Sequence, residues 1–384
     1  MDLEQSRWTA AGGWEPRLPG RLEDAQLVMV FGGPEVLKEP SLRAALAAAY
    51  PHAFLFGCST AGDIYGTQVS DDSLVATAIR FETTRIVGRT TRIVGPEDSF
   101  AAGERLAQSL AGDGLAHVFV LSDGLHVNGS KLVEGLSRNL PPDVTVTGGL
   151  SGDGPRFKET LVLGGMAGSG GAAPEPRTIA AVGFYGRGLR VGYASLGGWD
   201  PFGPERLITR SDSNVLYELD GRSALDLYKT YLGPHARELP ASGLLFPLSL
   251  RTGEGCTPVV RTILSVDEEQ SSMTFAGDVP EGSYARFMKA NFDRLIDGAV
   301  GAARTSYEAV GSTSPDLAVL VSCVGRKLVL KQRVEEEVEG VREVLGDRTV
   351  LAGFYSYGEI SPFTPDARCE LHNQTMTITT LTER

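Results

Sequence analysis

Short apolar runs that end in glycine recur along the chain and predict buried strands. The clearest is 25–33 (AQLVMVFGG), followed by helix formers at 41–50 (SLRAALAAAY) and by a second apolar run at 52–58 (HAFLFGC). Residues 72–82 and 84–94 alternate in the manner of two antiparallel strands. By the same criteria, the rest of this region is predicted to contain a helix at 99–112. Strands are predicted at 116–122, 143–149, 159–165, 177–186 and 188–198. Residues 166–177 (MAGSGGAAPEPR) predict an exposed hairpin tip.

The pattern resets near residue 213. From there the sequence predicts strands at 215–221, 258–269, 272–282, 316–323, 349–360 and 375–382, and helices at 222–233, 290–310 and 333–346. Strands and helices mix without strict alternation, so we expect an α+β fold of mixed and antiparallel sheets layered with helices. The length of 384 residues favours two domains. We place an N-terminal extension at 1–21, a first domain at 22–213 and a second at 214–384.

One similar segment occurs in both predicted domains. Residues 55–64 (LFGCSTAGDI) and 351–360 (LAGFYSYGEI) align without gaps, with glycine third, a hydroxyl sixth, then glycine, an acid and isoleucine. A related stretch, 147–154 (TGGLSGDG), lies between them. The similarity indicates pseudo-symmetric halves, and the alternative is convergence on a common strand-to-turn solution.

Net charge and hydropathy narrow the class of partner. The formal charge of −12 repels phosphate backbones and anionic lipid, so we expect no nucleic-acid partner and no membrane insertion. No apolar stretch reaches the roughly 18–20 residues of a membrane helix. The four cysteines contain no Cys-x-x-Cys pair, which argues against a zinc site built on such pairs and favours reduced thiols in a cytoplasm.

Polar Gly-rich corners follow several strands and are the candidate sites. Glycine lets the backbone turn, and small hydroxyl residues then expose donors beside free amides, an arrangement that suits carboxylates and phosphates. In the corner 122–129, Ser122 or Asn128 is equally suited to capping the helix that begins near Gly129.

The sequence gives weaker support to catalytic, nucleotide-binding and metal sites. Residues 57–61 (GCSTA) do not match the Gly-x-Ser-x-Gly nucleophile elbow, and a Cys58–His126–Asp153 arrangement rests on nothing but the presence of the three residues. Phosphate-loop and dinucleotide motifs are missing from the sequence, as are paired histidines for a metal. We therefore expect no enzyme activity and no metal site, and a cysteine-dependent enzyme remains the alternative.

Arg326 and two histidines stand in notable positions. Arg326 follows a predicted buried strand, so it suits either a ligand carboxylate or a structural carboxylate such as Glu359. His126 and His372 lie in polar corners, where each is a pocket residue, a haem-iron ligand or a satisfied structural histidine.

The corners together resemble the FIST family, in which an N-terminal FIST domain precedes a FIST C domain. The resemblance rests on FGCSTAGDI, LSDGLHVNGSKLVEGL, TGGLSGDG, GGWDPFGPERLITRS, NVLYELDG, FAGDVPEGS, GFYSYGEI and LHNQT, in this order from about residue 22 onward. It implies a sensory module for signal transduction, with amino acids proposed as ligands. Because no kinase, cyclase or receiver motif occurs, such a sensor would signal to a separate protein.

A subset of the family implies a second function. These members are described as haem-binding nitric oxide sensors that control histidine kinases in bacterial two-component signalling, and here His126 would be the axial ligand.

The sequence thus predicts a cytoplasmic sensor whose amino-acid-like ligand lies between the corners of both domains. Glycines would permit close approach, Ser59, Ser122 and Asn128 would donate hydrogen bonds, and Arg326 would take a carboxylate. Asp123, Asp153 and Glu359 would hold an ammonium group or orient Arg326. The full predicted set is Gly57, Cys58, Ser59, Thr60, Gly62, Asp63, Ser122, Asp123, His126, Asn128, Gly149, Gly152, Asp153, Arg326, Tyr355, Gly358, Glu359, His372 and Asn373.

Overall fold

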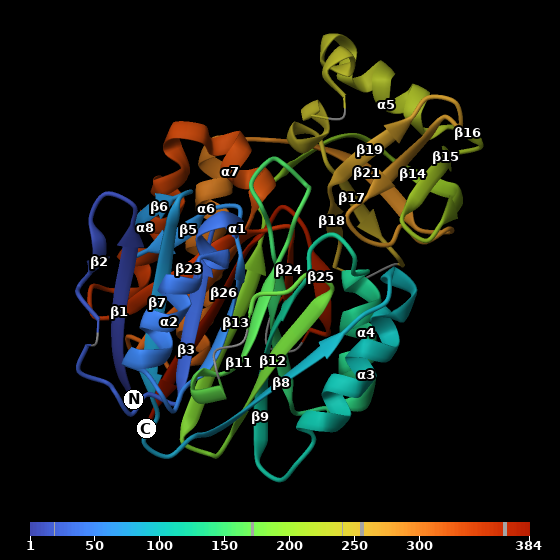
Figure 1. Cartoon of the computed structure of the whole chain (residues 1–384). Coiled ribbons are helices and arrows are strands. Elements are labelled where there is room, and N and C mark those ends of the chain that lie inside the picture. Colours follow the sequence, from blue (N-terminus) through green and yellow to red (C-terminus); the bar gives the residue numbers. More distant parts are fainter. Residues whose placement is uncertain (19, 170–172, 240, 254–256, 364–366) are drawn as a thin grey trace.

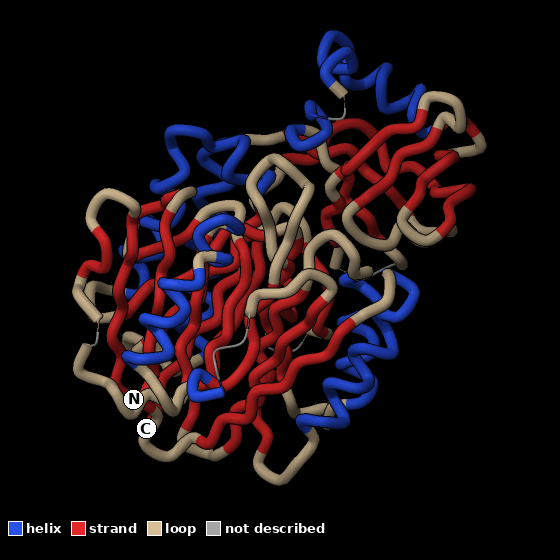
Figure 2. Tube along the Cα trace, viewed as in Figure 1, coloured by secondary structure: helices blue, strands red, loops and turns tan. Residues whose placement is uncertain are grey.

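The computed structural model has the expected α+β fold and divides into a large core and a smaller insert (Figure 1). It describes residues 1–18, 20–169, 173–239, 241–253, 257–363 and 367–384. The core comprises residues 1–199 and 290–384 and contains three six-stranded sheets, while the insert comprises residues 200–289 and contains an eight-stranded sheet. Figure 2 shows helices on the outer sides of the core sheets.

The core consists of three units that share one plan. Unit 1 contains β1 (Asp2–Thr9), β2 (Gly13–Glu15), β3 (Leu27–Gly32), α1 (Pro34–Lys38), α2 (Pro40–Ala49), β4 (Phe54–Ser59), β5 (Asp63–Tyr65), β6 (Gln68–Ser70) and β7 (Ser73–Arg80). Unit 2 contains β8 (Arg85–Arg92), α3 (Ser99–Leu110), β9 (Leu115–Ser122), α4 (Gly129–Asn139), β10 (Thr145–Leu150), β11 (Val162–Met166) and β12 (Thr178–Tyr185). Unit 3 contains β13 (Leu189–Leu196), α6 (Phe292–Ala309), β22 (Leu317–Cys323), α7 (Val324–Leu330), α8 (Val334–Leu345), β23 (Val350–Ser356), β24 (Gly358–Pro362), β25 (Cys369–His372) and β26 (Met376–Glu383).

Each unit donates one or two strands to the sheet of another unit: unit 1 donates β5 and β6, unit 2 donates β11, and unit 3 donates β24 and β25. The sheet orders are β11-β4-β3-β7-β1-β2, β25-β24-β10-β9-β12-β8 and β13-β26-β22-β23-β5-β6. In each sheet a parallel pair (β3/β4, β9/β10 or β22/β23) lies beside a donated antiparallel strand. Because β5 joins sheet 3, β11 joins sheet 1 and β24 joins sheet 2, the exchange is cyclic. The two similar segments expected from the sequence are therefore two copies of a three-fold structural repeat.

The insert interrupts unit 3 between β13 and α6. It contains β14 (Asp200–Asp212), β15 (Val215–Leu219), β16 (Arg222–Ser223), α5 (Ala224–Leu232), β17 (Leu248–Arg251), β18 (Val259–Arg261), β19 (Ile263–Asp267), β20 (Ser272–Phe275) and β21 (Tyr284–Lys289). Its own apolar cluster packs α5 against the sheet through Leu216, Tyr228, Phe275 and Phe287. The insert thus buries a separate core.

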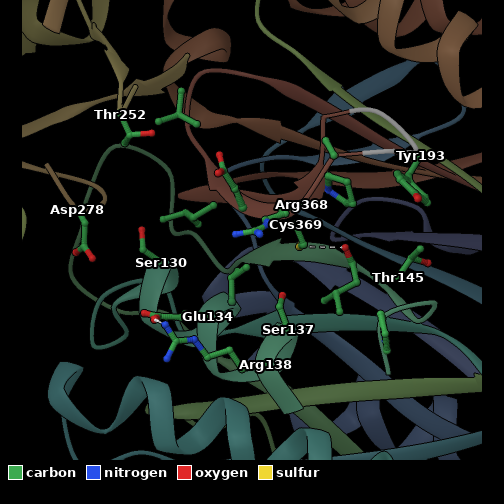
Figure 3. A pocket seen from close by; sticks show the side chains of 18 of the residues that line it. Ser130, Glu134, Ser137, Arg138, Thr145, Tyr193, Thr252, Asp278, Arg368 and Cys369 are labelled. Carbon is green, nitrogen blue, oxygen red and sulfur yellow. Dashed lines mark hydrogen bonds and ion pairs between the residues drawn. The ribbon is translucent and has the colours of Figure 1, made fainter. Parts of the chain in front are cut away.

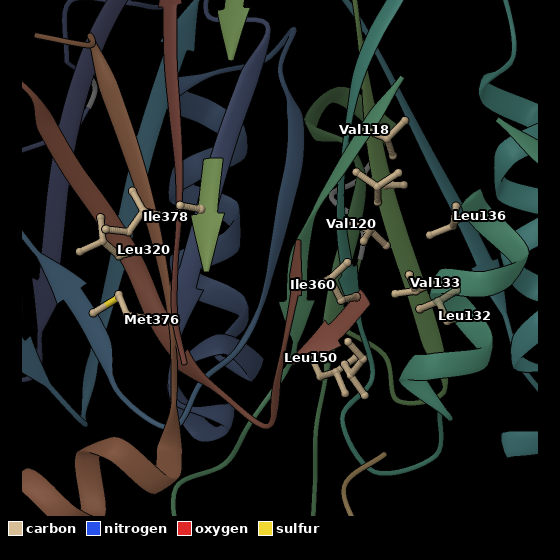
Figure 4. Close-up of a cluster of buried hydrophobic side chains, with 14 of the residues drawn as sticks. Val118, Val120, Leu132, Val133, Leu136, Leu150, Leu320, Ile360, Met376 and Ile378 are labelled. Carbon is tan, nitrogen blue, oxygen red and sulfur yellow. The ribbon is translucent and has the colours of Figure 1, made fainter. Parts of the chain in front are cut away.

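Strand alternation explains how the core packs. Phe119 and Leu121 point to the inner side of sheet 2, where residues of all three sheets meet and Phe31 stacks on Phe354 with ring centroids 4.8 Å apart. Val118 and Val120 point to the outer side, toward Leu132 and Leu136 of α4 (Figure 4). The three inner faces therefore share one apolar centre, and the helices cover the outer faces.

The structure departs from several sequence expectations. Residues 72–82 and 84–94 do not pair with each other, because β7 lies in sheet 1 and β8 pairs with β12 in sheet 2. The segment 1–21 contains β1, which pairs with β7 along its whole length. The domain boundary at 213/214 stays a prediction; in the structure these two residues form the turn between β14 and β15 of the insert. Residues 170–172 of the expected hairpin tip lie outside the described part of the chain.

Candidate functional site

Three equivalent glycines begin the bends at which the donated strands leave their units. Gly57, Gly148 and Gly353 pair in register with Val30, Val120 and Leu320 of the neighbouring parallel strands. A Cβ atom at any of the three would lie 1.8–2.0 Å from the carbonyl oxygen of that partner. We name bend 1 (57–63), bend 2 (148–153) and bend 3 (353–359); each needs glycine at its first position.

The three bends are joined in a ring of backbone hydrogen bonds. The amide of Ala61 donates to the carbonyl of Tyr355 at 2.8 Å, and the amide of Gly152 donates to the carbonyl of Ser59 at 2.9 Å. The amide of Tyr357 donates to the carbonyl of Leu150 at 3.2 Å. The corners predicted from sequence therefore do meet in space.

The acids of bends 1 and 3 point into the protein. Asp63 accepts hydrogen bonds from the hydroxyls of Thr60 and, at 3.0 Å, Ser73. Glu359 accepts from Ser356 at 2.6 Å and from the hydroxyl of Thr375 at 2.9 Å. Both carboxyls are fully buried, and burial raises the pKa of Asp63 to about 7 and that of Glu359 to about 8. These groups hold the bends and do not face solvent.

The acid of bend 2 fixes the loop that follows it. Asp153 accepts from the amides of Phe157, Lys158 and Glu159 at 2.8–3.0 Å and from the hydroxyl of Tyr357. The ring of Phe157 stacks on Tyr357 with centroids 4.3 Å apart. The carboxylate is satisfied by these donors, so it has little capacity left for a ligand ammonium group.

The corner 122–128 is likewise bonded to itself. Asp123 accepts from the amides of Leu125 at 2.8 Å, His126 at 2.7 Å and Arg177 at 2.8 Å, and the Nδ1 of His126 lies 3.2 Å from both of its oxygens. Ser122 donates to the carbonyl of Asp123. The corner is thus a folded polar loop with the imidazole one-third exposed at its rim.

Asn128 has two roles that bear on the site. Its Oδ1 accepts from the amide of Lys131 at 3.0 Å and caps α4, as the capping interpretation predicts. Its Nδ2 donates to Oδ1 of Asp278 at 2.9 Å. Since Asp278 belongs to the insert, this side chain joins the core to the insert.

Arg326 is a structural residue in this fold. Its guanidinium is fully buried and bonds Glu337 at 2.7 Å, together with the carbonyls of Gly197 and Leu295. The hydroxyl of Tyr355 donates to the same carboxylate at 2.7 Å. The expected partner Glu359 is therefore replaced by Glu337, and Arg326 lines neither hollow between the core and the insert.

The remaining predicted residues lie around these contacts. Ser59 donates to the carbonyl of Gly152 at 2.8 Å and accepts from the amide of Leu161 at 2.9 Å. A Cβ at Gly62 would meet the ammonium group of Lys327, one at Gly149 would meet Val321, and one at Gly358 would meet Leu150 and Leu371. Gly62, Gly149 and Gly358 thus allow close packing within the protein.

His372 ends β25, and Asn373 follows it in the turn before β26. The Nε2 of His372 lies 2.7 Å from the carbonyl of Ser361, and burial lowers the pKa of this imidazole to about 4. The Nδ2 and Oδ1 atoms of Asn373 are buried and have no hydrogen-bond partner among the described residues. The two residues are enclosed and line none of the hollows described next.

Two hollows lie between the core and the insert. The larger, which we call the junction cleft, has a volume of about 780 Å³; α4, β10 and β25 form its core wall, and β17, β18 and the loop at Asp278 form its insert wall (Figure 3). The smaller, of about 230 Å³, lies beside the bends and is lined by Leu125, Phe157, Tyr357 and Phe275 among others. Asn128 lines the smaller hollow and Asp278 the larger, so their hydrogen bond lies between the two.

Charged groups of both signs line the junction cleft. Arg138, Arg368, Glu134 and Glu370 come from the core, and Arg261 and Asp278 come from the insert. Glu134 and Arg138 form an ion pair of 2.6 Å, visible in Figure 3. Burial raises the pKa of Glu370 above its usual value, although Arg261 and Arg368 act in the opposite direction.

Two family models match the chain in tandem. The FIST N domain matches residues 26–222 and the FIST C domain matches residues 224–362. The chain belongs to the FIST family. A comparison with curated proteins finds no match. FIST domains are associated with signal transduction and the sensing of small ligands, and the two matches meet inside the insert of this FIST protein.

The surroundings of His126 do not fit a haem group. The Nδ1 of this imidazole faces Asp123, and the adjacent hollow of about 230 Å³ is below the roughly 300 Å³ at which small-molecule pockets begin. The lining of the junction cleft contains no histidine among the described residues. Within the described chain, no three histidine, cysteine or carboxylate side chains gather in a metal-binding cluster.

Cys58 lies in β4 and is fully buried. Burial raises the pKa of its thiol well above the usual value, and Asp63 adds to the effect. His126 pairs instead with Asp123 at the rim of the core. These contacts do not support the Cys58–His126–Asp153 arrangement.

Sequence reasoning missed the charged residues of the junction cleft. Arg261 lies inside an apolar run (PVVRTIL), and an arginine at such a position was the signal that could have been followed. Asp278 lies within FAGDVPEGS, a stretch whose order contributed to the family resemblance but received no role. None of the helices that the structure describes combines the length and apolar character needed to span a membrane.

Proposed function

We propose that this FIST protein is a cytoplasmic sensor that binds a small amino-acid-like metabolite in the junction cleft and signals to a separate protein. One observation carries the proposal: the cleft has walls from two bodies with separate apolar cores, and charged groups of both signs converge in it. A ligand that contacts both walls has a higher affinity for one arrangement of core and insert than for others. This difference in affinity shifts the population toward that arrangement.

The charge pattern favours a zwitterionic ligand. The guanidinium groups of Arg261 and Arg368 suit a carboxylate, and the carboxylates of Asp278 and Glu370 suit an ammonium group. Glu370 makes no ion pair within 4.0 Å among the described residues. The volume of about 780 Å³ lies within the range of small-molecule sites.

Location and output are part of the proposal. The free thiols of Cys58, Cys323 and Cys369 support a reducing compartment such as the cytoplasm. The family association with signal transduction supports an output through a separate signalling protein, such as a sensor histidine kinase.

A thermal-shift screen of the full chain against the twenty amino acids and related metabolites tests the proposal. A ligand that binds only the folded state at about 100 times its Kd stabilises it by about 2.7 kcal/mol, or on the order of 3 °C in Tm for a chain of this size. We expect Glu370→Gln to reduce the shift and Glu134→Gln, which lies in the same cleft but is paired with Arg138, to retain it. The absence of any stabilising metabolite, or a shift unaffected by every cleft substitution, would contradict it.

A further inference from the structure

Arg261 occupies an unusual position in the junction cleft. It ends β18 at the wall of the insert and is only 6% exposed. Its Nε donates to the carbonyl of Asp278 at 3.2 Å, and its Nη1 donates to the carbonyls of Val260 at 3.3 Å and Leu371 at 2.9 Å. A Cβ atom at Gly277 would lie 2.8 Å from the guanidinium, so glycine is needed there to make room for it.

No carboxylate pairs with this guanidinium among the described residues. Its hydrogen-bond acceptors are neutral carbonyls, whereas the other fully enclosed arginine, Arg326, forms a 2.7 Å ion pair with Glu337. Asp278 and Glu370 act on Arg261 at longer range, and burial still lowers its pKa to about 10. An enclosed charge without an ion partner is costly, since transfer from water is compensated only by close pairing.

We infer that Arg261 recognises the anionic end of the ligand, so that the junction cleft takes a compound bearing a carboxylate or another oxyanion. The inference rests on the proposed function and assigns to Arg261 the carboxylate-binding role that we expected of Arg326 from the sequence. The oxyanion supplies the missing ion partner of a guanidinium already oriented by three carbonyls. Because Nε and Nη1 donate to those carbonyls, Nη2 is the nitrogen whose hydrogens remain for the oxyanion.

The same side chain links ligand recognition to the contact between the two bodies. Arg261 comes from the insert, and Leu371, whose carbonyl it binds, lies in β25 of the core. β25 pairs with β24, the strand that follows bend 3 directly. An oxyanion on Arg261 therefore binds at the place where insert and core are joined.

Simple anions test the inference without knowledge of the natural ligand. The Tm of the full chain is measured in sodium acetate, malonate and phosphate, each against sodium chloride at equal ionic strength. We expect at least one of these anions to raise the Tm of the wild type and of Arg138→Gln, an exposed arginine of the same cleft, and to leave Arg261→Gln unshifted. Acetate or malonate acting alone identifies a carboxylate ligand, and phosphate acting alone identifies a phosphorylated one.

Circular dichroism and gel filtration would reveal whether Arg261→Gln fails to fold. A second variant, Arg261→Lys, tests the inference in that case. Arg261→Lys keeps the charge but loses the carbonyl-oriented guanidinium and its Nη2 donor, and we expect its half-saturating anion concentration to rise at least tenfold. No anion effect on the wild type, or an effect unchanged in Arg261→Gln or Arg261→Lys, would overturn the inference. A neutral metabolite that raises the Tm of Arg261→Gln as much as that of the wild type would also overturn this inference, but the proposed sensor function would still hold. If no metabolite in the screen raises the Tm of the wild type, the proposed sensor function itself is wrong.

Discussion

The amide of Gly152 donates a 2.9 Å hydrogen bond to the carbonyl of Ser59, although 93 residues separate them. Equivalent bonds run from Ala61 to Tyr355 and from Tyr357 to Leu150. Each bond joins a different pair of units, and each unit also donates a strand to another unit's sheet. The ring therefore closes a cyclic exchange in which no unit has a complete sheet alone.

The first position of each bend should accept only glycine. Gly353→Ala places a Cβ about 2.0 Å from the carbonyl of Leu320, so the parallel pair β22/β23 must separate or shift. We expect a loss of about 3 kcal/mol or more in the free energy of unfolding, measured by urea denaturation. Gly112→Ala is the matched control, because its nearest neighbour would lie at 3.7 Å. Equal stability of the two variants would contradict the packing described here.

Glu359 should make stability fall as pH rises. Its folded pKa of about 8 lies above the ordinary glutamate pKa of 4.5, so the folded state holds the proton more tightly than the unfolded state. The stabilisation is complete below about pH 4.5 and is lost progressively up to about pH 8. Glu359→Gln should therefore gain stability relative to the wild type between pH 5 and pH 8 in urea titrations. A stability difference between Glu359→Gln and the wild type that does not change with pH would refute the assignment.

The ion pair of Arg326 and Glu337 should behave as a buried structural pair. Arg326→Met leaves the Glu337 carboxylate buried without its cation, and we expect a loss of about 3–5 kcal/mol in the free energy of unfolding. Arg326→Met combined with Glu337→Leu should recover part of that loss, because no unpaired charge remains. A double variant less stable than Arg326→Met would speak against this account.

Asn128 should stabilise both α4 and the contact with the insert. Asn128→Ser keeps a capping oxygen but loses the bond to Asp278, whereas Asn128→Ala loses both. We expect Asn128→Ala to be less stable than Asn128→Ser by about 1 kcal/mol. Limited proteolysis should cut the junction faster in both variants than in the wild type, and unchanged cleavage in Asn128→Ser would show that the Asp278 bond is dispensable.

The sequence predicted the bends because their pattern is local. Glycine, a hydroxyl three places later and a following acid recur at Gly57, Gly148 and Gly353, and periodicity located most strands between them. It could not show three-fold exchange, because β5, β11 and β24 are short and their partners are distant in the chain. Bend 2 also has its acid one residue earlier, which hid the third copy.

The candidate site was harder to predict because side-chain direction decides it. Asp63, Asp153 and Glu359 look like ligand-binding acids in sequence, yet hydroxyls and amides of the protein itself occupy them. Arg326 and Arg261 both border apolar strands. Only the fold shows that the first meets Glu337 and the second meets carbonyl groups beside a cleft.

Hydrogen–deuterium exchange with a stabilising metabolite tests the central claim most directly. If the ligand binds between core and insert, amides of β18 (259–261) and β25 (369–372) should both gain protection, and Arg261→Gln should abolish the gain at both. Protection confined to the core or to the insert would contradict this claim. Protection at residues 84–89, which line a third hollow together with His52 and Met166, would contradict it as well.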